Sequence, residues 1–261
     1  MFGTDRNIAM NEALYSIVVP LYRSQAHLPK LIDFIRLNFS DKLAEVQLIL
    51  VVDGDNENYT FGGSLKNFGN TRIIYLKKNY GQYIATLCGL AEADGQAIIT
   101  MDADMHGLND IFTKTMLSEN TDGFDLVYTE FKYSQRGLLR EVGTRFYNGI
   151  ISRASKKEQH GHSGSSFRII TSALKDKLLA ATSNASLIDI NLLKLADKIN
   201  FVEMPVGEEA RSSYSLMGLV GMFAKVGLNV LFRSEKRAPF LPDIYISNSS
   251  DINMGHDNRK W

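Results

Sequence analysis

Short apolar runs alternate with helical patterns over the N-terminal part of the chain. Four runs rich in valine, isoleucine and leucine predict buried strands, at residues 15–19, 46–52, 72–76 and 97–101. Two sets of apolar residues between them recur at helical spacing: Leu28, Leu31, Ile32, Ile35 and Phe39, and then Ile84, Leu87, Cys88 and Ala91. This alternation is typical of parallel β-α-β units, so it predicts an α/β fold with an open, mainly parallel sheet.

The pattern is less regular in the rest of the chain. Residues 56–71 are rich in Asn, Gly and Thr and predict a loop, while residues 125–128 predict a strand and 137–154 a helix. Residues 216–238 combine an apolar helix with a basic cluster. That helix either meets an anionic membrane or packs on protein, and both readings stay open. We expect an N-terminal extension at 1–14 and a polar tail at 239–261, in which residues 247–261 lack fixed structure.

Composition excludes several classes of protein. The chain has 261 residues, 44% of them hydrophobic, and can bury a sizeable core. Lys plus Arg equals Asp plus Glu at 29 each, so no global charge points to nucleic acid as a partner. The single cysteine, Cys88, excludes an intrachain disulfide and a cysteine cluster for zinc.

No targeting or spanning segment is visible in the sequence. Residues 1–13 lack the apolar centre of a signal peptide, and no apolar run reaches the roughly 20 residues that a spanning helix needs. We therefore expect a cytoplasmic protein. Peripheral contact with the inner face of the cell membrane and assembly into a homo-oligomer are left open.

Polar or special residues follow three of the predicted strands. Pro20 ends the first, Asp53 the second, and Asp102 and Asp104 follow the fourth. Because the carboxyl ends of parallel strands share one edge, these residues should converge on a single crevice. Two carboxylates this close repel each other, and a hard divalent cation carrying a diphosphate would relieve that repulsion. The sequence contains neither a dinucleotide fingerprint nor a P-loop, which leaves a nucleotide held by carboxylate, metal and loop backbone.

These motifs resemble, in order and spacing, those of the family 2 glycosyltransferases. The matching segments are Val18-Val19-Pro20-Leu21-Tyr22, the strand ending in Asp53, Asn79-Tyr80-Gly81-Gln82, and Thr100-Met101-Asp102-Ala103-Asp104. The likeness is greatest to the polyprenyl-phosphate sugar transferases, the group of dolichyl-phosphate mannose synthase. It implies a GT-A fold with helices on both faces of the sheet and a catalytic domain over residues 15–215.

The resemblance also implies an inverting hexosyl transfer from a nucleotide-diphosphate sugar. The implied acceptor is a polyprenyl phosphate or a cell-surface glycan intermediate. Asp104 is expected to hold Mg²⁺ or Mn²⁺ on the diphosphate. The residues expected at the nucleotide are Pro20, Tyr22, Asp53, Asn79, Gln82, Asp102 and Ala103.

The acceptor side departs from the family pattern. Ser166 stands where many relatives carry an aspartate, and a serine at its ordinary pKa cannot replace an acid as general base. Either the acceptor is already ionised, since a phosphate has its second pKa near roughly 6, or another acid serves, with Asp189 as the candidate. Arg168 and Arg211 supply positive charge for phosphate, and Tyr214 matches a family position near them.

A second reading comes from another functional class. A chain that keeps Asp102 and Asp104 but has lost its base at Ser166 would bind a nucleotide sugar without turning it over. Such a protein would serve as a non-catalytic binding or assembly subunit of a glycan-synthesis complex. Metal-dependent turnover of a nucleotide sugar favours the enzyme, and tight binding without turnover favours the binder.

Overall fold

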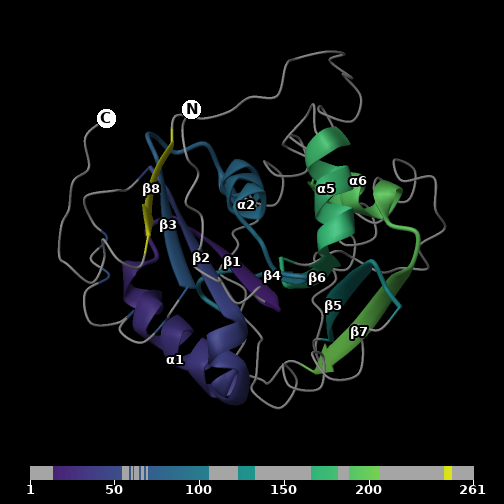
Figure 1. The fold of residues 1–261 in the computed structure, drawn as a ribbon, viewed down its shortest axis with the longest axis horizontal. Coiled ribbons are helices and arrows are strands. Elements are labelled where there is room, and N and C mark those ends of the chain that lie inside the picture. The colour runs from purple at the N-terminus through teal and green to yellow at the C-terminus, as the bar shows by residue number, and fades with distance from the viewer. Residues whose placement is uncertain are drawn as a thin grey trace, which may run out of the picture.

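The fold is built on one eight-stranded sheet with the strand order β7-β5-β6-β4-β1-β2-β3-β8 (Figure 1). The computed structural model describes residues 14–54, 59, 61, 65, 68, 70–105, 123–132, 166–181, 188–205 and 244–248. The strands are β1 (Tyr15–Leu21), β2 (Val46–Asp53), β3 (Asn70–Leu76), β4 (Ala97–Thr100), β5 (Leu126–Lys132), β6 (Arg168–Thr171), β7 (Ile199–Pro205) and β8 (Ile244–Asn248).

Most neighbouring strands of the sheet pair in parallel, including all pairs among β1, β2, β3 and β4. β1 pairs in parallel with both β2 and β4, β2 pairs in parallel with β3, and β5 does so with β7. β6 runs antiparallel between β4 and β5, and β8 lies antiparallel on the outer edge of β3. The predicted mainly parallel sheet is confirmed, and its first four strands end at the same edge.

Helices cover both faces of this sheet (Figure 1). On one face α1 (Leu28–Asn38) packs the predicted apolar stripe into the first core layer, flanked by the short helices η1 (Gln25–His27) and η2 (Ser40–Glu45). On the other face α2 (Gln82–Ala91), α5 (Ser172–Ala181) and α6 (Ile188–Leu195) enclose the second layer. Both faces of the strands are therefore buried, which explains their continuous apolar sequences.

The first strand continues past Pro20, where the sequence predicted its end. Pro20 lies opposite Val51 of β2 in the ladder. Toward β4 the last contact of β1 is the Val18 carbonyl, which accepts the N–H of Met101 at 3.2 Å. Pro20 follows two residues later on that same edge, beyond the end of β4, so no partner strand needs its missing donor.

Helix α2 buries a different face from the predicted one. Its buried residues are Ala85, Thr86, Gly89 and Leu90, whereas Ala91 is exposed and Cys88 is half-buried. A Cβ at Gly89 would lie only 2.3 Å from Cγ1 of Val18. The helix thus approaches the sheet through its smallest residues, a contact that apolar periodicity alone does not reveal.

Two segments predicted to lack regular packing contribute to the sheet and its core. Within the predicted loop at 56–71, the described side chains of Tyr59, Phe61, Leu65 and Phe68 are buried in the first core layer. Within the predicted tail at 239–261, β8 pairs with β3, so the prediction that residues 247–261 lack fixed structure is wrong for Ser247 and Asn248. The alternating β-branched run of β8 covers an edge that would otherwise expose unpaired backbone groups.

Other predicted segments lie outside the described residues. They are the extension at 1–13, the helix at 137–154 and the apolar and basic stretch at 216–238. Among the helices that the structure describes, none has the length and apolar character needed to span a lipid bilayer.

Candidate functional site

A cavity of about 440 Å³ opens at the carboxyl ends of β1, β2 and β4. Every residue predicted to hold the nucleotide or the metal lines it: Pro20, Tyr22, Asp53, Asn79, Gln82, Asp102, Ala103 and Asp104. Three polar lining side chains were not predicted, namely Arg23, Ser24 and His27. The convergence follows from the parallel order of the strands, which brings these ends to one edge.

Asp53 is committed to the backbone at the start of α2. Its Oδ1 accepts the N–H of Tyr80 at 2.7 Å and its Oδ2 accepts the N–H of Gly81 at 2.8 Å. Burial raises the pKa of this carboxyl, although both backbone donors act in the opposite direction. Asp53 therefore fixes the turn that carries Asn79 and Gln82 into the cavity.

The loop after β1 forms another wall of the cavity. Ser24 Oγ donates to the Tyr22 carbonyl at 2.9 Å, and the Ser24 N–H donates to the hydroxyl of Tyr59 at 2.7 Å. Arg23 has a φ of +53°, uncommon for a residue with a side chain, and its guanidinium lies 5.2 Å from the ring centre of Tyr22. Arg23 could have been predicted as a cavity residue from the sequence, because it is a basic residue just past the end of the first strand.

Asp102 is the less exposed member of the acid pair, partly buried where Asp104 is exposed. Gln82 Nε2 donates to its Oδ1, and Ser166 Oγ donates to its Oδ2 at 2.6 Å. Burial raises the pKa of Asp102, and the charge of Asp104 adds to the rise, whereas the Ser166 hydrogen bond and the Arg168 charge oppose it. The two acids thus repel each other, as the sequence predicted, and the repulsion acts on a partly buried Asp102.

The acid pair fits a hard divalent cation. Both carboxylates line the cavity, and a bound cation would offset the burial and the repulsion from Asp104 that together raise the pKa of Asp102. Among the residues that the structure describes, no cluster of three or more His, Cys, Asp or Glu side chains is arranged to hold a metal. Such a site suits Mg²⁺ or Mn²⁺ that takes its remaining ligands from phosphate oxygens and water.

The residues predicted for the acceptor side lie behind the acids. Ser166 reaches Asp102, but Arg168 and Asp189 form an ion pair with each other and do not line the described cavity. Asp189 stands in the first turn of α6, with its side chain only 14% exposed. Arg211 and Tyr214 fall outside the described residues.

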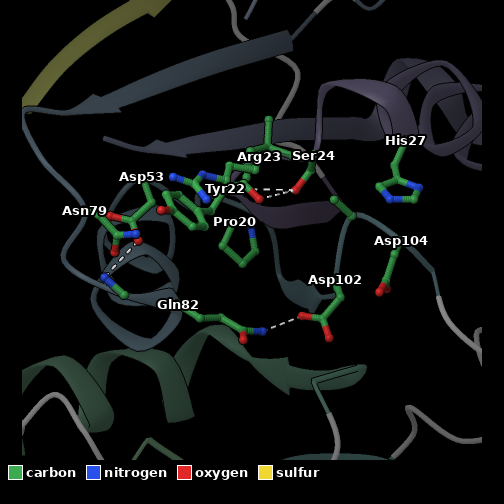
Figure 2. Close-up of a pocket in the computed structure, with 13 residues that line it drawn as sticks. Pro20, Tyr22, Arg23, Ser24, His27, Asp53, Asn79, Gln82, Asp102 and Asp104 are labelled. Atoms are coloured by element: carbon green, nitrogen blue, oxygen red, sulfur yellow. Dashed lines mark hydrogen bonds between the residues drawn. The ribbon is translucent and has the colours of Figure 1, made fainter. Parts of the chain in front are cut away.

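The cavity has two chemically different ends, as Figure 2 shows. Tyr22, Asp53 and Asn79 gather at one end, where an aromatic ring and a backbone turn are available. Asp104 and His27 lie at the other end, with Asp102 and Gln82 along the floor. Such a trough can hold an elongated ligand with a flat ring at one end and a cation-bound anionic group at the other.

Comparison with known proteins gives concordant results. The family model described as glycosyl transferase family 2 matches residues 16–176. Two relatives are 30% identical over 224 residues, which cover 82% of this chain and 67% of each relative. They are the undecaprenyl-phosphate 4-deoxy-4-formamido-L-arabinose transferases of Yersinia pestis bv. Antiqua (strain Angola) and Yersinia pseudotuberculosis serotype I (strain IP32953).

Solved structures resemble this fold at low sequence identity. Glucosyl-3-phosphoglycerate synthase from Mycobacterium tuberculosis, in complex with Mn²⁺, UDP-glucose and phosphoglyceric acid, aligns with a TM-score of 0.60 at 18% identity, covering 87% of this chain and 81% of that one. Mannosyl-3-phosphoglycerate synthase from Rubrobacter xylanophilus aligns at 0.54 and 14%, covering 88% and 79%. These likenesses establish the GT-A fold, and with the family match they show that the chain belongs to glycosyl transferase family 2.

Proposed function

We propose that this glycosyltransferase moves a sugar from a nucleoside diphosphate sugar to a polyprenyl phosphate. The observation that carries the proposal is the joint placement of Asp102 and Asp104 in one cavity with the ends of β1 and β2. The family assignment supports the transfer chemistry, and the names of the relatives, undecaprenyl-phosphate sugar transferases, support the acceptor class.

The two ends of the cavity suggest how the donor lies. We place the nucleoside near Tyr22, Asp53 and Asn79, where the exposed ring of Tyr22 can stack on a base. The diphosphate then reaches Asp104, which would hold the divalent cation, while Asp102 accepts hydrogen bonds from the donor beside it. The M. tuberculosis neighbour was solved with Mn²⁺ and UDP-glucose, which supports a metal-bound donor of this kind.

The proposed reaction is an inverting displacement. A phosphate oxygen of the acceptor forms a bond to the anomeric carbon while the bond from that carbon to the diphosphate breaks, and the electron pair leaves on the nucleoside diphosphate. The cation, when bound, acts as a Lewis acid that stabilises this leaving group. The protein contributes by fixing donor and acceptor in line and by excluding water from the cavity.

No general base is required if the acceptor is a phosphate. A phosphate monoester has its second pKa near roughly 6, so it is largely a dianion at neutral pH and already nucleophilic. The hydroxyl of Ser166 donates to Asp102 and is thereby occupied as a donor. Of the two alternatives that Ser166 leaves open, the proposed reaction takes the first, in which the acceptor brings its own ionised oxygen.

We also propose residues 15–215 as the catalytic domain and a working place at a membrane surface. A polyprenyl phosphate lies in a lipid bilayer, so the cavity must come close to one. The stretch at 216–238, outside the described residues, carries the apolar and basic side chains suited to that contact. Flotation of the full chain with anionic vesicles, with and without this stretch, tests the contact.

Product formation tests the proposed function. The full chain is incubated with undecaprenyl phosphate and a panel of UDP-, GDP- and dTDP-sugars, with Mg²⁺, with Mn²⁺, or with a chelator. We expect one donor class to yield a sugar-phosphate lipid by mass spectrometry, and the yield to vanish with the chelator. Tight donor binding without any turnover across the panel would contradict the proposal and favour a binding subunit.

A further inference from the structure

Asp102 is held by side-chain donors from two directions. Gln82, in the first turn of α2, donates to Oδ1, and Ser166, just before β6, donates to Oδ2 at 2.6 Å. Each carboxylate oxygen therefore has a fixed donor, which leaves its remaining lone pairs in one orientation. Figure 2 shows the Gln82 contact along the floor of the cavity.

Ser166 is itself held in place by a side chain of β4. Thr100, the last residue of β4, donates its hydroxyl to the Ser166 carbonyl at 2.8 Å. Arg168 Nε then donates to the Thr100 hydroxyl at 2.9 Å, and the two residues face each other in the β4–β6 ladder. The position of Ser166 thus depends on a threonine two residues before Asp102 and on the arginine behind it.

Arg168 in turn forms a largely buried ion pair with Asp189. Arg168 Nη1 donates to Asp189 Oδ1, and the hydroxyl of Tyr128 donates to the same oxygen at 2.8 Å. The Arg168 and Asp189 side chains are 5% and 14% exposed, in an otherwise apolar layer. The contacts form one chain, here called the buried polar network: Ser166, Thr100, Arg168, Asp189 and Tyr128.

A buried network of this kind is expected to stabilise the fold no more than apolar side chains would. Removing a guanidinium and a carboxylate from water costs about as much as their mutual attraction returns, and apolar side chains of similar volume serve a core equally well. A network whose members are all hydrogen-bonded does, however, restrict its groups to one arrangement. This one begins at β5 and α6 and ends on the acid that faces the donor.

We propose that the buried polar network is a positioning device that fixes the Asp102 carboxylate for sugar transfer. The proposal rests on the proposed function and assigns Ser166 as the residue that acts directly on Asp102. Asp189 is then the counter-ion of Arg168 and positions Asp102 through it. The network residues act through Asp102, so their effect is lost when Asp102 is lost.

Substitution of Ser166 tests the contact nearest the cavity. Ser166→Ala removes the donor, and we expect kcat to fall about tenfold, as for a slightly misplaced catalytic group, with the donor KM changed by less than about twofold. Ser166→Thr keeps the hydroxyl and is expected to restore kcat to within about threefold of the wild type. An unchanged kcat in Ser166→Ala overturns the proposal.

A double-mutant cycle tests whether Ser166 acts through Asp102. In an Asp102→Asn background, Ser166→Ala is expected to cause no further loss of kcat/KM. Losses that multiply in the double variant would show two independent effects and overturn the proposal. Thermal melting of each variant confirms that the compared proteins are folded.

Tyr128→Phe tests the far end of the network with little risk to folding. It removes only a hydroxyl, and we expect kcat to fall about twofold to thirtyfold, the range observed for remote positions coupled to a site. Tyr15→Phe, at the opposite end of β1 from the cavity, is the matched control and should leave kcat unchanged. A Tyr128→Phe variant with a lower melting temperature but wild-type kcat would assign the network to stability and overturn the proposal.

The two proposals fail in different ways. A wild-type chain that forms no product with any donor contradicts the proposed function before any variant is compared. A wild-type chain that transfers sugar, with Ser166→Ala and Tyr128→Phe equally active, contradicts only the positioning role.

Discussion

Asp53 is a buried carboxylate that accepts two backbone hydrogen bonds, from Tyr80 and Gly81. Asp53→Asn would turn an amide donor toward the N–H of Tyr80 or Gly81, leaving one partly buried N–H without an acceptor, at the lower end of the cost of about 1–3 kcal/mol for a buried group. The turn before α2 would loosen, and we expect weaker nucleotide binding by calorimetry from a protein that remains folded. Nucleotide affinity equal to the wild type would contradict this role for Asp53.

The pH dependence of stability offers a second test of Asp53. Because burial raises its pKa, the folded chain holds this proton more tightly than the unfolded chain, whose pKa is near 3.8. The stability that Asp53 contributes therefore falls as the pH rises from 3.8 through the folded pKa, and is constant above it. In urea unfolding, the free energy of unfolding of the wild type minus that of Asp53→Asn should decline as the pH rises over this range. A difference that grows with pH would contradict the assigned shift.

Cys88 should behave as an inert thiol. Burial, assisted by the negative charge of Asp53, raises its pKa from 9.0 to about 12. The thiolate fraction at neutral pH is then about a thousandfold below that of an ordinary thiol. We expect iodoacetamide to alkylate native Cys88 far more slowly than urea-unfolded Cys88, as followed by mass spectrometry. Equal rates in the two states would show that the thiol is open to solvent.

At the scale of elements, α2 is placed by the smallness of Gly89. Gly89→Ala gains about 1 kcal/mol of helix propensity but puts a methyl group 2.3 Å from Val18 Cγ1 and 3.0 Å from Val51 Cγ2. Overpacking costs typically 1–3 kcal/mol, so we expect net destabilisation in thermal unfolding. The control Ala91→Gly, on the exposed face, should lose only the propensity of about 1 kcal/mol. A Gly89→Ala variant more stable than the wild type would refute this packing.

Elements defined by local pattern could be predicted from the sequence, whereas those defined by distant pairing could not. The face of α1 followed from five apolar residues at helical spacing, and the acids at the ends of β2 and β4 followed from parallel β-α-β order. The contact of Ser166 with Asp102 spans 64 residues and depends on β6 lying antiparallel beside β4. No local periodicity in the sequence indicates that β6 lies beside β4. For the same reason the sequence did not predict the ion pair between Arg168 of β6 and Asp189 of α6.

At the scale of the whole molecule, the carboxyl ends of the parallel strands form the cavity, whereas their amino ends carry contacts that hold the fold together. At the end opposite the cavity, buried Gln47 accepts from the Ser16 hydroxyl at 2.6 Å and from the Asp94 N–H at 2.9 Å. Gln47 also donates to the Glu92 carbonyl at 3.1 Å. This cluster joins β1 and β2 to the chain between α2 and β4, and none of these hydrogen bonds involves a residue that lines the cavity.

Gln47→Leu should therefore separate stability from function. The buried Ser16 hydroxyl would lose its acceptor, as would the Asp94 N–H, and we expect the free energy of unfolding to fall by about 1–3 kcal/mol in urea titration. Transfer activity per folded molecule should equal that of the wild type, because the catalytic ends of the strands are unchanged. A loss of kcat greater than the loss of folded protein would contradict this division of tasks.

The central claim is that Asp104 holds a cation that neutralises a nucleoside diphosphate. Calorimetric titration of UDP with and without Mn²⁺ tests it most directly, comparing wild type, Asp104→Asn and the control Asp33→Asn, whose side chain is 78% exposed on α1. We predict that Mn²⁺ tightens UDP binding at least about tenfold, equivalent to about 1.4 kcal/mol, in wild type and Asp33→Asn but not in Asp104→Asn. An Asp104→Asn variant that keeps the full Mn²⁺ enhancement would contradict the account.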